Sequence, residues 1–219
     1  MRASIPAALI AVSCVLGARE GRPDVPPIAV AASFGWASPV GSAERGGRLR
    51  DTTFGMLPLE LDVAYGLLPA LGITAHVQYG IGVPTLCQTA ADCTASLGTD
   101  VEAVLGVRWH LPWVGPVAPL VDWCVGYEWF TARFADAGAQ STRSYRGPVL
   151  ASLRFAAPFR LGPHWTLGPL VDASAGTFTA QSLEGSAFSI SRDVPARAVH
   201  GWIQVGLRLE FSPRTQRVR

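Results

Sequence analysis

The chain contains no lysine and no asparagine, and charged residues occupy only 16% of its 219 positions. Soluble domains usually carry about 25% charged residues, so this sequence has few side chains with which to keep a surface in water. All 18 basic residues are arginine, and the net charge of +2 gives no sign of a nucleic-acid partner. The preference for arginine has two explanations, a GC-rich coding bias and selection for phosphate contacts.

Long apolar runs are also missing, although 49% of the residues are hydrophobic. After the N-terminus, no apolar segment approaches the roughly 20 residues that a transmembrane helix needs. High hydropathy without long runs is typical of a transmembrane β-barrel, because apolar and polar residues alternate along each of its strands.

One short apolar stretch, Ile5 to Leu16, follows a single arginine near the N-terminus. It is too short to span a membrane and predicts a secretory signal peptide over residues 1–18, followed by a Pro-rich lead-in over 19–27. Cys14 weakly resembles the lipidated cysteine of a lipoprotein signal. Because Ala11 replaces the usual leucine three positions earlier, lipidation of Cys14 stays open.

The chain has only four cysteines, and export would permit disulfides between them. Cys87 and Cys93 flank a short polar segment, which favours a local disulfide that closes this loop. Free thiols and intermolecular pairing are the alternatives. Cys124 stands in a predicted strand, and we expect it to be a small buried residue.

Strict alternation with period two is the main pattern that is present. In LPLELDVAY (57–65) every second residue is Leu, Val or Tyr, and Glu60 and Asp62 lie between them. This pattern is typical of strands whose two faces meet different surroundings. It recurs in eight predicted strands, which cover 28–37, 55–66, 72–82, 100–111, 117–129, 148–158, 165–177 and 198–211.

The connections between these strands alternate in length. Those after the first, third, fifth and seventh strands are long and polar, whereas those after the second, fourth and sixth are short. This alternation places all long loops at one end of the strands and all short turns at the other. It predicts an all-β, antiparallel up-and-down transmembrane β-barrel of about eight strands, with four external loops and short periplasmic turns. The barrel would occupy 28–211, and 212–219 would be a C-terminal tail.

The two faces of the predicted strands differ completely in charge. The apolar parity carries no Asp, Glu, Arg or His, and aromatic residues on it gather near both strand ends, as in interfacial girdles. We therefore expect this parity to face lipid. The alternative is a soluble lipocalin-like barrel with the apolar parity inside. Girdle aromatics are predicted at Trp36, Tyr79, Trp129, Trp109, Trp165 and Phe211.

The polar parity would face the lumen, and eight strands enclose just enough space for side chains to fill. Its arginines should pair with neighbouring carboxylates such as Asp62, Asp122 and Glu210, because buried charges must be compensated. The acids outnumber the arginines, so some of them should hold protons, water or cations. The predicted lumenal charge network consists of Glu60, Asp62, Arg108, Asp122, Arg154, Asp172, Arg208 and Glu210.

Two lumenal histidines, His76 and His110, would lie near the turn end of adjacent strands. A metal site with Asp62 is conceivable from these residue types. We expect ordinary hydrogen-bonded core histidines instead, and no metal or cofactor.

The last predicted strand ends in QVGLRLEF (204–211), which resembles the C-terminal assembly signal of Gram-negative outer-membrane barrels. Gln204, Gly206, Leu209 and Phe211 fill its polar, glycine, apolar and aromatic places. The tail SPRTQRVR departs from that family, whose members usually end on the aromatic residue. The resemblance to small eight-stranded outer-membrane barrels covers roughly 28–211. It implies a bacterial outer-membrane location, contact with membrane lipid and lipopolysaccharide, and insertion by the barrel assembly machinery.

Roles in that family range from structure and adhesion to lipid-modifying enzymes. Lipid A deacylases carry a His-x-Ser pair on one strand, whereas the nearest candidate here reads His200-Gly201-Trp202. With no triad visible, we expect no enzyme but a structural or surface-interaction scaffold. A narrow ion channel and a lipid-modifying enzyme are the alternatives. The loop arginines could contact lipopolysaccharide phosphates or a surface partner, or simply be solvated.

Overall fold

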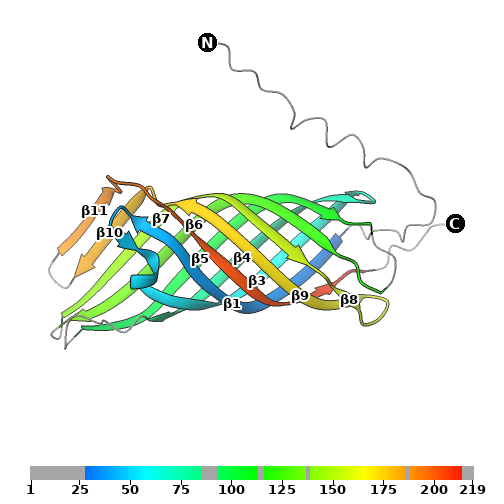
Figure 1. Cartoon of the computed structure of the whole chain (residues 1–219), viewed down its shortest axis with the longest axis horizontal. Helices are drawn as coiled ribbons and strands as arrows, with labels where there is room; N and C mark the ends of the chain where they lie inside the picture. Colours follow the sequence, from blue (N-terminus) through cyan, green and yellow to red (C-terminus); the bar gives the residue numbers. More distant parts are fainter. Residues whose placement is uncertain (1–27, 85–92, 113–115, 137–138, 186–187, 214–219) are drawn as a thin grey trace, which may run out of the picture.

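The computed structural model describes residues 28–84, 93–112, 116–136, 139–185 and 188–213. It confirms the all-β prediction: eight long antiparallel strands form the barrel wall (Figure 1). No helix among the described residues has the length and hydropathy to cross a membrane. The wall strands are β1 (Ile28–Glu44), β3 (Thr53–Leu68), β4 (Leu71–Pro84), β5 (Cys93–His110), β6 (Leu120–Asp136), β7 (Ala139–Ala156), β9 (Trp165–Thr177) and β12 (Val199–Phe211).

The barrel closes where the first strand meets the last. Each wall strand pairs with the next along the chain, and β1 pairs with β12 from Val30↔Phe211 to Gly41↔His200. Closure leaves no free edge, so the backbone groups of the wall are satisfied without water.

Two glycines face each other at this seam, and the close approach of the strands explains them. A Cβ atom on Gly35 would collide with the carbonyl oxygen of Val205, and one on Gly206 would collide with that of Phe34. A larger residue at either position would push β1 and β12 apart.

The alternating side chains of the wall strands point to opposite faces, with apolar residues outside the barrel and charged residues inside. Leu61 is 66% exposed on the outside, whereas its neighbours Glu60 and Asp62 are 3% and 1% exposed in the lumen. In the membrane-spanning part of the other wall strands the charged side chains likewise lie inside, so the soluble lipocalin-like alternative is wrong. In β7 the strand irregularity between Val149 and Ala151 turns Val149 inward, where the alternation places it outside, and Leu150 is 53% exposed. The predicted girdle residues Tyr79, Trp129, Trp109, Trp165 and Phe211 all lie among the exposed large side chains on this outer surface, and Trp36 is half-buried.

All four of the predicted long loops contain strand, which corrects their prediction as loops. β1 continues to Glu44, and β5 begins at Cys93. β6 and β7 continue to Asp136 and Ala139, and the connection after β9 holds a hairpin of β10 (Ala180–Gly185) and β11 (Phe188–Asp193). β10 pairs with β7, so the sheet extends past the end of the barrel (Figure 1, left). The bilayer limits how many residues must be apolar, but nothing in it stops strand pairing, and Ser- and Thr-rich segments pair well.

Smaller elements complete the two ends. β2 (Gly47–Arg48) and the 3-10 helix η2 (Leu49–Asp51) lie in the connection between β1 and β3. β8 (Phe159–Arg160) lies in the turn before β9. The predicted signal peptide (1–18), the lead-in (19–27), Cys14, Cys87 and residues 214–219 of the tail lie outside the described residues, and Cys93 is described in its backbone only.

The lipid-facing role of the outer surface can be tested with Leu105, which is 61% exposed in the middle of β5. We predict that Leu105→Arg destabilises the folded barrel in lipid vesicles by roughly 2–4 kcal/mol, the cost of arginine near the bilayer midplane. Urea unfolding followed by tryptophan fluorescence measures this change. Leu161→Arg is the matched control, because Leu161 is 62% exposed but lies in a turn. Equal costs for the two variants would contradict a lipid-facing wall.

Candidate functional site: the filled lumen

Asp62 of β3 lies at the centre of the lumenal charges. Arg208 of β12 binds it with both Nη atoms, at 2.9 Å for Nη2–Oδ1 and with a second contact from Nη1 to Oδ2. Arg108 of β5 donates from Nη2 to Asp62 Oδ1 at 3.3 Å, and Arg154 Nη1 lies 3.8 Å from Oδ2. A single carboxylate thus joins three arginines from three other strands.

Each arginine also binds a carboxylate of its own. Arg108 makes a bidentate pair with Asp122 of β6, with distances of 2.8 Å (Nε–Oδ1) and 2.7 Å (Nη2–Oδ2). Arg208 Nη2 lies 2.8 Å from Glu210 Oε2, and Arg108 Nη1 lies 3.6 Å from the same oxygen. Bidentate and shared contacts of this kind are the strong form of the arginine–carboxylate interaction.

Arg154 connects the network to the opposite wall. Its Nε lies 3.0 Å from Asp172 Oδ2 of β9, and its Nη2 lies 2.7 Å from Glu60 Oε2 of β3. Ser152 donates to Asp172 Oδ1 at 3.1 Å. The structure therefore brings all eight residues of the predicted charge network together, in one connected set that spans six strands.

An acid-rich layer lies next to this network on the loop side. Glu128 of β6 accepts hydrogen bonds from Trp202 Nε1 at 2.9 Å and is paired with His200 Nε2 at 2.7 Å. Gln78 donates to Asp100 at 3.2 Å. Among the described side chains, Glu128 and Asp100 have no arginine within ion-pair distance. Glu128 is instead bound by His200 and Trp202, and Asp100 by Gln78.

The two histidines considered for a metal site lie apart. His76 Nε2 is 3.7 Å from Glu102 and 3.4 Å from Arg154 Nη2, whereas His110 lies at the turn-end opening. Within the described ranges, no group of three or more His, Cys, Asp or Glu side chains has the geometry to hold a metal ion.

An apolar plug closes the loop end of the lumen, and parity sorting by charge missed it. Phe178 stacks on His200 with ring centroids 3.7 Å apart, and it also contacts Tyr145 at 5.1 Å. Phe130 lies 6.1 Å from Trp202. The signal was present, because Phe130 and Trp202 stand on the same parity as the charges. The plug consists of Ala37, Ala43, Leu49, Met56, Phe130, Ala132, Tyr145, Phe178, Val194 and Trp202.

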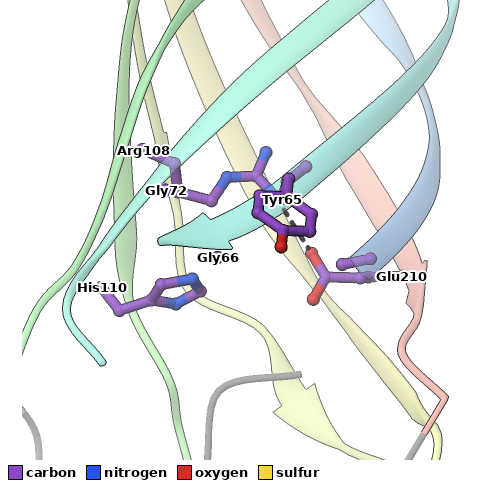
Figure 2. Close-up of a pocket in the computed structure, with 8 residues that line it drawn as sticks. Tyr65, Gly66, Gly72, Arg108, His110 and Glu210 are labelled. Atoms are coloured by element: carbon purple, nitrogen blue, oxygen red, sulfur yellow. Dashed lines mark ion pairs between the residues drawn. The ribbon is translucent and has the colours of Figure 1, made fainter. Parts of the chain in front are cut away.

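A small pocket lies at the turn end of the lumen. Figure 2 shows Arg108 and Glu210 joined by an ion pair, with His110 and Tyr65 beside them. The pocket has a volume of about 20 Å³, which is room for roughly one water molecule. Arg108 Nη1 has no hydrogen-bond partner among the described residues, so a water molecule here would satisfy it.

Comparisons with solved structures agree with this architecture. A major outer membrane protein from Thermus thermophilus superposes with a TM-score of 0.55, at 14% identity over 84% of this chain and 98% of that one. The chain has the fold of a small outer-membrane β-barrel. Lower scores of 0.47 relate it to the attachment invasion locus protein Ail of Yersinia pestis (14% identity; 84% and 98% covered) and to OprG of Pseudomonas aeruginosa (12%; 87% and 99%). Neither a family model nor a curated protein matches the sequence.

The predicted assembly signal and Cys124 can also be placed in the barrel. Gln204 is buried in the lumen, and Leu209 and Phe211 point outward from β12, with Phe211 packed against Trp165 at 4.9 Å. Cys124 is a free, buried thiol beside Val104 and Val149. The predicted disulfide between Cys87 and Cys93 falls outside the described side chains.

The central carboxylate gives the second prediction. Asp62→Asn keeps the shape of the side chain but removes the charge that three arginines share, so it should destabilise the barrel by roughly 3–5 kcal/mol. Urea unfolding in vesicles measures the change, and the mobility of unboiled protein on SDS gels reports folding. The control is Asp51→Asn in the exposed loop of η2. A cost for Asp62→Asn no larger than that of the control would show that the network is dispensable.

Proposed function

We propose that this protein is a closed structural and surface-interaction scaffold, which holds four external loops at the surface of a bacterial outer membrane. The observation that carries the proposal is the filled lumen. The apolar plug closes the loop end, and the arginine network lies across the barrel behind it. A barrel filled in this way has its external end as the surface available to partners.

The external end carries an excess of positive charge, which supports an anionic partner such as lipopolysaccharide phosphate. The acids with described side chains at this end are Glu44, Asp51, Glu184 and Asp193. They are outnumbered by Arg45, Arg48, Arg50, Arg133, Arg143, Arg146, Arg192 and Arg197.

A narrow ion channel is the runner-up, and the plug argues against it. Phe130, Phe178 and Trp202 are between 0% and 3% exposed, and they fill the lumen between the acid-rich layer and the outside. An ion would have to displace aromatic side chains that pack on one another. It would then have to pass arginines that are already paired.

A lipid-modifying enzyme is also disfavoured by the geometry. His200 and Glu128 form a close pair, but His200 is 1% exposed beneath Phe178. The contacts found for His200 among the described residues include no serine hydroxyl that it could activate. We therefore propose a non-enzymatic role.

Insertion by the barrel assembly machinery is part of the proposal. Leu209 and Phe211 are 40% and 36% exposed on the lipid side of the closing strand β12, where another protein could contact them before closure. Gly206 permits the close seam with β1 described above.

The closed lumen predicts that the protein does not conduct ions across a bilayer. Wild-type protein reconstituted in planar bilayers should produce no discrete conductance steps, because the plug and the ion pairs leave no continuous water path. A porin inserted under the same conditions is the positive control. Reproducible steps that disappear when the protein is omitted would overturn the closed scaffold in favour of the channel.

The scaffold role predicts that loops can be exchanged without loss of the barrel. Replacing residues 180–193, the β10–β11 hairpin, with a short Gly/Ser linker should leave the heat-modifiable gel mobility intact, since the hairpin lies outside the closed wall. Binding of the protein to outer-membrane lipopolysaccharide or to surface partners should change. The matched control replaces the turn at 161–164, at the opposite end. A lost gel shift for the hairpin variant alone would show that the hairpin is needed for the fold.

A further inference from the structure

A polar patch interrupts the apolar outer wall at the loop end of β5, β6, β7 and β10. The strand register places four hydroxyl side chains side by side, through the pairs Thr99↔Thr131, Thr131↔Ser144 and Ser144↔Ser182. Thr131 Oγ1 and Ser144 Oγ are 3.2 Å apart. All four side chains are half-buried rather than covered by protein.

Two arginines flank this row on the same outward face. Arg146 lies on the membrane side of the row, directly opposite Trp129, and Arg133 lies on its far side, opposite Thr142. Both arginines are exposed. We call the two arginines and the four hydroxyl residues the head-group patch.

The position of the patch relative to the bilayer follows from its neighbour. Trp129 is 43% exposed and belongs to the aromatic girdle, which marks the boundary between hydrocarbon and head groups. The hydroxyl row is the next outward-facing position along β6, and Arg133 is the one after that. Outward-facing residues repeat at about 6.6 Å along a strand, which is about 5 Å along the membrane normal for a strand tilted by about 40°, so Thr131 and Arg133 lie at the depth of lipid head groups.

Among the described side chains, the arginines of the patch have no counter-charge of their own. Neither guanidinium forms an ion pair or a side-chain hydrogen bond with the described side chains, whereas the lumenal arginines are each paired two or three times. Thr142 of β7 lies between Arg133 and the nearest acid in this register, Glu184. Glu184 is on β10, two strands away from Arg133. Two free forks with hydroxyl donors between them are the donor set that phosphate oxygens prefer.

We propose that the head-group patch binds the phosphate groups of an outer-leaflet lipid. This proposal rests on the proposed function, because it takes the outer-membrane location and an anionic partner from it. It adds the site, which the loop arginines alone do not define. The arginines hold the phosphates from both sides of the hydroxyl row, and Trp129 packs against the apolar part of the lipid. A loop-bound protein partner would not need charges at this depth.

The test measures lipid binding by the full-length folded barrel in zwitterionic detergent, with diphosphoryl lipid A as the probe and native mass spectrometry as the readout. Each arginine near an anionic surface contributes about 1 kcal/mol, or roughly a factor of five in affinity. Arg133→Gln and Arg146→Gln should each weaken binding about fivefold, and the double variant about 30-fold. Arg160→Gln is the matched control, because Arg160 is also exposed but lies at the turn end.

Three results would overturn the proposal. Arg160→Gln could weaken binding as much as either patch variant, which would mean that only net charge matters. The double variant could bind like the wild type. Inorganic phosphate could bind with the same dependence on both arginines and displace the lipid, which would make the patch a site for free phosphate.

The same preparations separate this inference from the proposed function. If the protein shows heat-modifiable mobility and no conductance but the double variant binds lipid normally, the patch is wrong and the scaffold stands. If the protein conducts, the scaffold fails whatever the lipid result. The double variant must keep the gel shift of the wild type, which is expected because both substitutions are at exposed positions.

Discussion

The shared carboxylate of Asp62 is the interaction on which the inside of this barrel depends. Three arginines from β5, β7 and β12 converge on it, and each of them also holds a carboxylate from another strand or from further along its own. Removing charges from water costs several kcal/mol for each ion, so such a core is tolerated only when every charge has close partners. Each arginine of the network has at least two carboxylates close by, and contacts such as Arg154–Glu60 reach across the lumen between strands that are not neighbours. The network therefore ties opposite sides of the wall together, which the backbone hydrogen bonds between neighbouring strands cannot do.

Lipid on the outside and charge on the inside are linked through the sequence. The outer parity is occupied by Leu, Val, Ile and aromatic residues, which leaves the inner parity as the place for charge within the membrane. A packed polar lumen and an apolar exterior are therefore two results of one alternation. The plug shows that the alternation does not require charge inside. Where the wall leaves the bilayer, the lumen becomes aromatic, and the outer face becomes hydroxyl- and arginine-rich.

Much of this architecture could be predicted from the sequence, because a period of two decides which residues share a face. The eight strands, the inverted faces and the members of the charge network followed from parity alone. The choice of partners followed only in part. The expected carboxylates Asp62, Asp122 and Glu210 do bind Arg108 and Arg208. The closest partners of Arg154 are instead Glu60 and Asp172, because partner choice also depends on how the strands lie across the lumen. The plug was missed for a related reason, because Leu49 and Val194 come from segments without periodicity.

The strand extensions were not predicted because their residues are polar. Residues such as Thr131, Arg133, Ser144 and Arg146 looked like loop because they are polar, yet they continue the ladder between β6 and β7. Polar side chains on the outer face of a barrel strand show that the segment lies outside the hydrocarbon. They do not show that its backbone has left the β conformation. A strand that loses its apolar outer parity has left the hydrocarbon while still being a strand. The depth at which this change occurs can be read from the register with Trp129, and it brings Arg146 to the membrane boundary as part of a rigid wall. An arginine held there by a β-ladder keeps a fixed depth relative to the lipid head groups, whereas the depth of an arginine in a loop is not set by the ladder.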